Sequence, residues 1–366
     1  MPPQPSSTDM QPDNKPPIPV VAIGASAGGM EAFSELLTNL SPTTGLAYVY
    51  IQHMSPSHES QLAAIFSRVT QMPVLEAEHL VPVEANKVYI IPPNKSMEIV
   101  DGVLTLMPRR RKSEPELETA PEKLQHLPID QFFVSLAERQ KDGAIGVVLS
   151  GMAHDGTLGL RAIKVAGGIT FAQDSTARHL SMPQSAIAEG VVDLVLSPKG
   201  IAAELERLSQ QPEVFQQTAL AETQAESAMD ADESPEEDLR AIIQFLRKAI
   251  GVDFSLYKMT TIRRRIIRRM VLYKQETLKA YLHYLRLHSI EASLLYNDLL
   301  INVTSFFRDE ETMEFLKADV LPKLIKRKSD RDPLRIWVPG CSTGQEAYSL
   351  AMMLLELVGD ETHPIA

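Results

Sequence analysis

The first half of the chain alternates short apolar runs with longer stretches in which apolar residues recur every three or four positions. The short runs are almost continuously apolar, which is typical of parallel strands covered on both faces. The longer stretches have the spacing of amphipathic helices. We therefore predict an α/β domain with a doubly wound, mostly parallel sheet. The predicted strands are 20–24, 47–52, 87–91, 144–150, 169–172 and 192–196, with a hairpin at 98–106, and the predicted helices are 30–40, 61–69, 129–141, 157–166, 183–189 and 199–208.

The polarity pattern changes after residue 209. Residues 212–238 hold nine acidic residues and no Lys or Arg, which predicts a linker because such a segment repels itself and buries little apolar surface. Helical spacing then continues from 239 to about 327, and a strand (334–338), a tight loop (340–344) and a helix (345–358) are predicted to follow. The predicted organisation is a disordered tail (1–18), the α/β domain (19–209), the acidic linker (210–236), an all-α domain (237–328) and the start of a Rossmann-like domain (329–366).

Composition narrows the class of protein. A net charge of -11 argues against a general nucleic-acid binder. The single cysteine, Cys341, excludes an internal disulfide framework and fits a reducing compartment. The sequence contains no apolar segment near the roughly 20 residues that span a bilayer, and its N terminus lacks the basic and apolar parts of a signal peptide. We therefore expect a cytoplasmic protein without membrane insertion.

One glycine-rich segment stands out at the end of the first predicted strand. Residues Gly24–Gly28 (GASAG) fit G-x-S-x-G, a sharp strand-to-helix turn that exposes a serine hydroxyl. A phosphate-binding loop is an alternative, because a helix N terminus attracts anions. However, the segment lacks G-x-x-x-x-G-K-[ST], and Ser26 stands where G-x-G-x-x-G requires glycine. In a third interpretation, Ser26 only caps the helix that follows.

A nucleophilic serine needs a base and a group that orients the base. His53 follows the strand 47–52 and Asp155 follows the strand 144–150, so both lie with Ser26 at the carboxyl ends of predicted parallel strands. The alternatives are an ordinary surface histidine at His53, with His154 as a competing base, and an Asp155 that caps the helix at 157. The order Ser–His–Asp differs from that of the α/β-hydrolases and indicates another sheet topology.

The segments IGASAGG, IQHM, LSGMAHDGTLG and AQDSTARHLSMPQSAI together resemble the catalytic domain of the chemotaxis protein-glutamate methylesterases, over roughly residues 20–208. These enzymes hydrolyse glutamate methyl esters on bacterial chemoreceptors and deamidate certain receptor glutamines. The resemblance implies Ser26 as nucleophile, His53 as general base and Asp155 as its orienting acid, with no cofactor and no metal. It also implies an oxyanion site at the backbone N–H groups of Ala27 and Met152. Ala27 departs from the threonine common in the family.

Two further expectations concern regulation and rival functions. Typical members of this family carry an N-terminal receiver domain, whereas about 18 residues precede the first predicted strand here. We therefore expect an esterase that is not controlled by its own phosphorylation. A non-catalytic adaptor that binds receptor helices and a general serine esterase outside chemotaxis are the alternatives.

The second half contains a strongly basic helical pattern, TTIRRRIIRRMVLYK at 260–274. Its apolar residues predict a core stripe and its arginines a basic face. That face is interpreted as solvated, as in contact with the acidic linker, or as a docking surface for acidic helices. Nucleic-acid binding is disfavoured because no aromatic residues interleave the arginines.

The segments FSLYKMTTIRRRIIRRM, LLINVTSFFRDEE and RIWVPGCSTGQEAYSLAM resemble the chemotaxis receptor methyltransferases, over residues 237–366. The resemblance implies S-adenosylmethionine as cofactor and a basic helix that faces the Glu-rich helices of the receptor. Gln345 and Ala347 depart from the common Glu-Glu-Pro pattern. One strand and one helix cannot bury both faces of a sheet, so we do not expect this chain alone to transfer methyl groups. The residues implied in cofactor binding are Asn302, Thr304, Arg308, Gly340, Gly344 and Glu346.

A chain with both modules would keep the esterase, which removes receptor methyl groups, and the methyltransferase, which adds them, on the same receptor cluster. Tethering raises the effective concentration of each activity at the other's substrate. The whole sequence therefore predicts a fusion of a receptor methylesterase with the front part of the opposing methyltransferase.

Overall fold

The computed structural model describes residues 18–52, 61–108, 127–210, 234–300, 306–327, 334–342 and 344–358. The chain divides into two compact units, Met1–Leu299 and Leu300–Ala366. Most of the predicted tail (1–17) and of the predicted linker (211–233) lies outside the described residues.

A seven-stranded sheet in the order β10-β9-β8-β1-β2-β5-β3 forms the centre of the first unit. Every strand pairing in it is parallel, which confirms the predicted sheet. The short edge strand β3 is absent from the sequence prediction. The strands are β1 Val20–Ala25, β2 Ala47–Gln52, β3 Val74–Glu76, β5 Val88–Ile90, β8 Ala144–Val148, β9 Ile169–Gln173 and β10 Leu194–Leu196.

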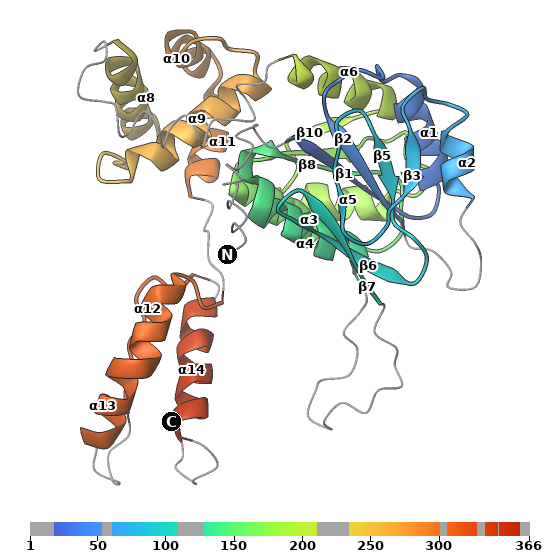
Figure 1. The fold of residues 1–366 in the computed structure, drawn as a ribbon. Helices are drawn as coiled ribbons and strands as arrows, with labels where there is room; N and C mark the ends of the chain where they lie inside the picture. The colour runs from blue at the N-terminus through green and yellow to red at the C-terminus, as the bar shows by residue number, and fades with distance from the viewer. Residues whose placement is uncertain are drawn as a thin grey trace, which may run out of the picture. The chain divides into compact units, whose positions relative to one another are not determined.

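Helices cover both faces of this sheet, as Figure 1 shows. Side chains of β1 alternate between the two cores, with Val21 and Ile23 in one and Val20 and Ala22 in the other. This double burial explains why the strands are apolar throughout. The first core is covered by α1 Gly29–Thr38, α2 Leu62–Phe66 and α6 Pro198–Ser209, and the second by α3 Pro128–Gln140, α4 Thr157–Ala166 and α5 Ser181–Ala188.

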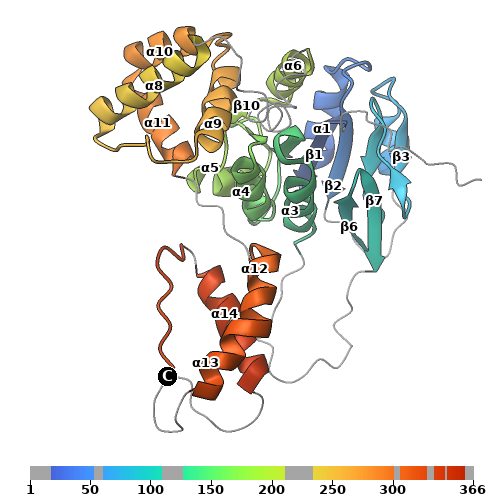
Figure 2. The same cartoon turned by 60° about the vertical axis from the view of Figure 1, so that its left-hand side comes forward.

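The predicted hairpin is part of a small antiparallel sheet in the order β4-β7-β6. Its turn residues Asp101 (φ 50°) and Gly102 (φ 77°) both have the left-handed conformation that a two-residue hairpin favours. Met97 and Ile99 of the hairpin are fully buried in the second core, beside α3 (Figure 2). The elements are β4 Val81–Pro82, β6 Lys95–Val100 and β7 Val103–Pro108, and the 3-10 turn Lys141–Gly143 follows α3.

Four helices in the described residues 234–299 form a core of their own. The inner positions of the basic helix, Ile262, Ile266 and Met270, belong to this core and confirm the predicted apolar stripe. Leu246 and Tyr281 from neighbouring helices pack with them. The helices are α8 Ser234–Ile250, α9 Met259–Leu272, α10 Leu278–Leu287 and α11 Ser289–Leu299.

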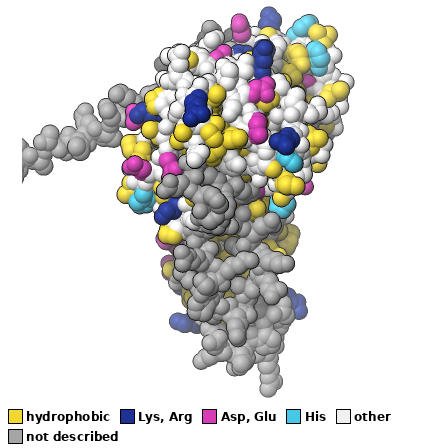
Figure 3. Space-filling model, turned by 90° about the vertical axis from the view of Figure 1, so that its right-hand side faces the viewer, with side chains coloured by type: hydrophobic (Ala, Val, Ile, Leu, Met, Phe, Trp, Pro, Cys, Tyr) yellow, Lys and Arg dark blue, Asp and Glu magenta, His cyan; other side chains and the backbone are white. Residues whose placement is uncertain are grey.

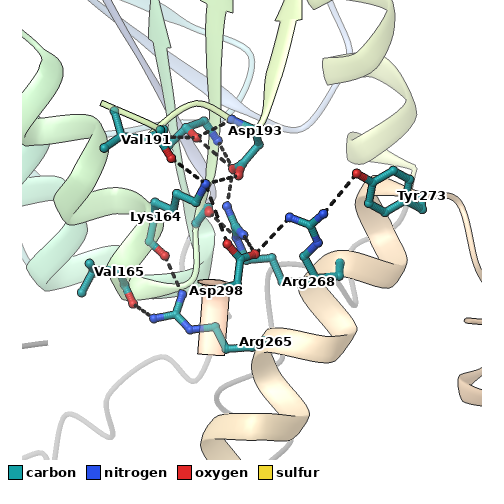
Figure 4. A network of polar contacts seen from close by, with 12 residues as sticks. Lys164, Val165, Val191, Asp193, Arg265, Arg268, Tyr273 and Asp298 are labelled. Carbon is teal, nitrogen blue, oxygen red and sulfur yellow. Dashed lines mark hydrogen bonds and ion pairs between the residues drawn. The ribbon is translucent and has the colours of Figure 1, made fainter. Parts of the chain in front are cut away.

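The arginines of α9 contact the α/β part of the same unit (Figure 4). Arg265 donates to the carbonyl oxygens of Lys164 and Val165, both at 2.6 Å. These carbonyls belong to the last turn of α4, where a helix lacks internal partners and carries partial negative charge. Arg265 therefore caps the C terminus of α4 from another part of the chain.

A buried ion-pair cluster surrounds the next arginine of α9. Arg268 donates to the Gly168 carbonyl oxygen (2.9 Å), to Asp193 and to Asp298 of α11 (2.9 Å). Lys164 lies 3.2 Å from Asp193. Burial raises the pKa of Asp193, but the charges of Arg268 and Lys164 outweigh this and hold that pKa below its ordinary value. The solvated-face interpretation is therefore wrong for Arg265, Arg268 and Arg269, which are all buried.

The second unit contains α12 Glu310–Phe315, a π-helical segment Leu316–Val320, α13 Leu321–Arg327 and α14 Gln345–Val358. Helix α14 has the predicted bounds. Its core is small, with Met313, Leu321, Met353 and Leu354 as the buried residues. The predicted strand 334–338 is wrong, because no strand among the described residues pairs with it and a strand is held by hydrogen bonds to a neighbour.

The surface shows no single dominant charge on the described part of the face in Figure 3, where positive and negative side chains are interspersed. Within the described ranges, no helix is both long enough and apolar enough to cross a membrane. The same ranges contain no group of three or more His, Cys, Asp or Glu residues placed to hold a metal ion.

Candidate active site

The predicted catalytic residues follow three adjacent strands of the sheet. Ser26 comes directly after β1, and Asp155 lies in the loop after β8, which pairs with β1. On the other side of β1, β2 ends at Gln52, immediately before His53, which lies outside the described residues. From β1 the chain proceeds to β2 on one side and later to β8 on the other. Ligands of open parallel sheets bind at such a switch point, beyond the carboxyl ends of the strands.

The serine lies in a strand–turn–helix, as G-x-S-x-G requires. The Ser26 N–H donates to the Ser150 carbonyl oxygen (3.0 Å), and Gly29 N–H donates to the Ser26 carbonyl oxygen (2.9 Å). The N-cap of α1 is Gly28, not Ser26, which argues against the capping interpretation. Gly28 has φ 73°, and a Cβ there would lie 2.7 Å from the Ser150 hydroxyl. Glycine is therefore required at this position both by backbone conformation and by space.

Asp155 is fully buried and caps a helix, but not the helix expected from the sequence. Its Oδ2 accepts from Ile129 N–H (3.0 Å) and its Oδ1 from Asp130 N–H (2.9 Å), both in the first turn of α3. The N-cap of α4 is instead Gly156, without a side-chain cap, so the alternative of a cap on the helix at 157 is wrong. Two backbone donors at a helix N terminus fix the orientation of this carboxylate.

Asp130 is a second buried carboxylate close to this position. Its Oδ1 accepts from Gly159 N–H in α4 (2.7 Å), so Asp155 caps α3 while Asp130, which belongs to α3, caps α4. Burial raises the pKa of Asp130 to about 6, and the charge of Asp155 contributes to the increase. Sequence reasoning missed this residue, although a carboxylate in the first turn of an amphipathic helix is a visible signal.

The first predicted oxyanion donor is the N–H of Ala27. This N–H and the Ser26 carbonyl belong to the same trans peptide, and the Ser26 carbonyl oxygen accepts a hydrogen bond from Gly29 N–H. Because the two groups of a trans peptide point in opposite directions, this bond orients the Ala27 N–H.

The second predicted donor, the N–H of Met152, shares its peptide with the Gly151 carbonyl. That carbonyl accepts from Met182 N–H (3.1 Å) and from the Ser181 hydroxyl (3.2 Å). The following residue, Ala153, has a left-handed backbone (φ 65°), which is uncommon for a residue with a Cβ and recurs at functional sites. A Cβ at Gly151 would lie 3.1 Å from Ser26 Cβ, so this loop packs directly against the serine.

The second unit holds the described members of the implied cofactor set. Gly340 (φ 68°) and Gly344 (φ 99°) have left-handed backbones before α14, and Glu346 is exposed in its first turn. Phe307 N–H donates to the Ser349 hydroxyl of α14 (2.9 Å), which brings the end of NVTSFFR, including Arg308, to that helix. Asn302 and Thr304 lie outside the described residues.

These residues fit part of an S-adenosylmethionine site. A Cβ at Gly340 would meet no atom of the described residues within 4 Å, which fits a close approach of a ligand to the backbone there. The exposed carboxylate of Glu346 is a suitable partner for the cofactor's ammonium group.

Family models match both parts of the chain. The CheB methylesterase model matches residues 21–205, half of the chain. The chain belongs to the CheB methylesterase family. The models of the CheR methyltransferase all-alpha domain and SAM binding domain match residues 237–300 and 302–365. A CheB module and CheR modules are therefore joined in one chain, as the sequence predicted.

Individual relatives cover the chain to different extents. A 104.1 kDa protein from the hypE 3′ region of Rhodobacter capsulatus is 34% identical over 308 residues, 81% of this chain and 31% of that protein. The protein-glutamate methylesterase/protein-glutamine glutaminase 2 of Anaeromyxobacter dehalogenans is 33% identical over 202 residues, 55% of this chain and 56% of that protein. The chain thus spans about a third and about half of these two relatives. The crystal structure of the Thermotoga maritima CheB methylesterase catalytic domain is 30% identical and covers 52% of this chain and 97% of that chain, with a TM-score of 0.45.

Proposed function

We propose that this chain hydrolyses glutamate methyl esters on the cytoplasmic helices of bacterial chemoreceptors, with Ser26 as nucleophile. The observation that carries the proposal is the position of Ser26 in a strand–turn–helix beside the loop of a buried Asp155. The activity printed in the name of the Anaeromyxobacter relative supports both ester hydrolysis and glutamine deamidation. We place this activity in the cytoplasm, where the methylated receptor helices lie.

The proposed reaction has two halves. His53 takes the proton of the Ser26 hydroxyl, and Ser26 Oγ attacks the ester carbonyl carbon while Asp155 orients the imidazole. The N–H groups of Ala27 and Met152 stabilise the oxyanion that forms. Methanol, or ammonia from glutamine, leaves with the proton held by His53. A water molecule deprotonated by His53 then releases the glutamate and restores the serine.

We further propose that the CheR part of the chain contributes to an S-adenosylmethionine site. Gly340 and Gly344 would let the backbone approach the cofactor, and Glu346 would bind its ammonium group, with Asn302, Thr304 and Arg308 along the same site. When bound, the cofactor supplies an electrophilic methyl group. The expectation that this chain alone does not transfer methyl groups remains a prediction.

The decisive experiment is the release of methanol from methylated receptor membranes. We expect Ser26→Ala to abolish it, because no other group is proposed to attack the ester, with a loss of roughly 10⁴-fold or more. Ser34→Ala, the same change on the adjacent helix α1, should leave the rate unchanged. His53→Ala should resemble Ser26→Ala.

The alternatives give other outcomes. Receptor binding without methanol release from the wild type would replace the proposal with the adaptor function. Equal turnover of short-chain esters and receptor esters would replace it with a general esterase.

A further inference from the structure

Ser150 joins more parts of the site than any residue that the sequence singled out. It lies between the end of β8 and the Gly151–Met152 loop, and none of its surface is exposed. A polar residue buried in this way needs a partner for each of its polar groups. Four hydrogen bonds provide these partners, and each goes to a different group around the serine turn.

The backbone of Ser150 holds two strands in place. Its carbonyl oxygen accepts from Ser26 N–H (3.0 Å), at the end of β1. Its N–H donates to the Oε1 atom of Gln173 (2.9 Å), the last residue of β9. The main chain of Ser150 thus links the carboxyl ends of β1, β8 and β9.

The side chain of Ser150 links the serine turn to the loop before α5. Its hydroxyl donates to the Ala27 carbonyl oxygen (2.8 Å) and accepts from His179 N–H (2.9 Å). His179 in turn accepts at its carbonyl oxygen from Gly151 N–H (3.0 Å). One hydroxyl group therefore connects both segments that carry the predicted oxyanion donors.

This arrangement fixes the Ala27 N–H from both sides. The Ser26 N–H before it and the Ala27 carbonyl after it both bond to Ser150, so neither flanking dihedral can change without breaking a buried hydrogen bond. On the other side, Gly151 is held by His179, and Met152 follows it in the chain. Oxyanion stabilisation depends on such preorganised donors.

We propose that Ser150 is a positioning residue that sets the distance between the Ser26 nucleophile and the two oxyanion donors. The inference rests on the proposed function of that site, but it concerns a residue that the predicted triad and oxyanion donors do not include. Both hydrogen bonds of its hydroxyl go to backbone groups, those of Ala27 and His179, and it acts through them.

The test compares Ser150→Ala with Ser135→Ala in receptor demethylation. The Ser135 hydroxyl also accepts from a backbone N–H (Ile99, 3.1 Å) and donates to a backbone carbonyl (Phe132, 2.8 Å), away from the serine turn. We expect Ser150→Ala to lower kcat by roughly 10- to 100-fold with KM within about twofold. Ser135→Ala should keep the wild-type kcat, and Ser150→Thr, which retains the hydroxyl, should recover most of the lost rate. If the alanine variant does not fold, Ser150→Cys takes its place. This change preserves the volume of the side chain and should also lower kcat.

A second measurement does not depend on activity. Hydrogen exchange followed by mass spectrometry should show faster exchange in Ser150→Ala for the backbone N–H groups of residues 26–29 and 151–153, and unchanged exchange elsewhere in the sheet. Wild-type kcat in the alanine or cysteine variant, an equal loss in Ser135→Ala, or unchanged exchange at both segments would overturn the inference. A wild type without activity would instead reject the proposed function, and the exchange data would still decide the role of Ser150.

Discussion

Two buried carboxylates at the site each cap a helix, Asp155 the helix α3 and Asp130 the helix α4. Only Asp155 is a predicted catalytic residue. Asp155 is held by the N–H groups of α3, whereas Asp130 on α3 is held by Gly159 of α4. The Oδ2 atom of Asp130 has no hydrogen-bond partner among the described residues. Asp155 and His154 are the charged or titratable groups that act on it.

This arrangement predicts a dependence of stability on pH. The folded-state pKa of Asp130 is about 6, against an ordinary 3.8, so the folded protein binds this proton more tightly than the unfolded chain. The stabilisation is complete below about pH 4 and is lost as the pH rises through about 6. In Asp130→Asn the Oδ1 acceptor remains and the titration disappears. We expect the free energy of unfolding of the wild type, relative to this variant, to fall by on the order of 2 kcal/mol between about pH 4 and pH 7.

Urea denaturation across this pH range measures the difference. Asp101→Asn, at an exposed carboxylate in the hairpin turn, is the matched control and should give a nearly constant difference. A constant difference for Asp130→Asn as well would contradict the prediction.

Sequence reasoning singles out the proposed catalytic residues more easily than the residues that hold them in place. Ser26 and Asp155 are recognisable because both follow apolar strands within distinctive segments. Ser150 and Gln173 also end apolar strands, but their role depends on hydrogen bonds between segments distant in the chain. Asp193 gave a signal as the one charged residue in VVDLVL, yet its partner is 75 residues away on α9.

At the scale of elements, one interpretation of the sequence placed the arginines of α9 on a solvated surface. In the structure, three of them are buried in a contact within the first unit. These residues, Arg265, Arg268 and Arg269, share one face at helical spacing, and that face meets α4, Gly168 directly before β9, and α11. The pattern of the helix could be predicted from sequence, but its neighbour could not. The same holds for residues 334–338, whose apolar run has no partner strand in the described part of the chain.

A double-mutant cycle tests the contact between α9 and the α/β part. We expect Arg268→Met and Asp193→Asn each to lower the free energy of unfolding by roughly 3 kcal/mol or more, because each removes one charge from a buried ion-pair cluster and leaves the opposite charges without their full compensation. The double variant should lose less than the sum of the two, by about 1–3 kcal/mol. Urea unfolding gives these values, and Arg286→Met on the exposed side of α10 is the control. Simple additivity of the two changes would show that the pair is not coupled.

At the scale of the whole molecule, the two units differ in how much they bury. Among the described residues, the first has three extensive cores and the cluster around Arg268, whereas the second has four buried apolar residues. The free energy of local opening is smaller where fewer apolar side chains are buried.

Native-state hydrogen exchange should therefore separate the chain into two classes. We expect the backbone N–H groups of β8 and α9 to share one opening free energy, since Arg268 of α9 bonds to Gly168 directly before β9, and β9 pairs with β8. Those of α14 should exchange through an opening of lower free energy. Arg268→Met should split the first class by releasing α9. Exchange of α9 ahead of β8 in the wild type would contradict a cooperative first unit.

The position of strand β9 affects how fusions of a methylesterase module with methyltransferase modules can evolve. At one end, Thr170 and Gly168, which directly precedes the strand, contact the Arg268–Asp193 cluster, and at the other end Gln173 holds Ser150. The esterase module therefore cannot be exchanged by recombination without matching Asp193 and the end of α4 to the arginines of the incoming helix. Substitutions in the two modules are selected together, and swapped chimaeras should recover stability through changes at this seam first.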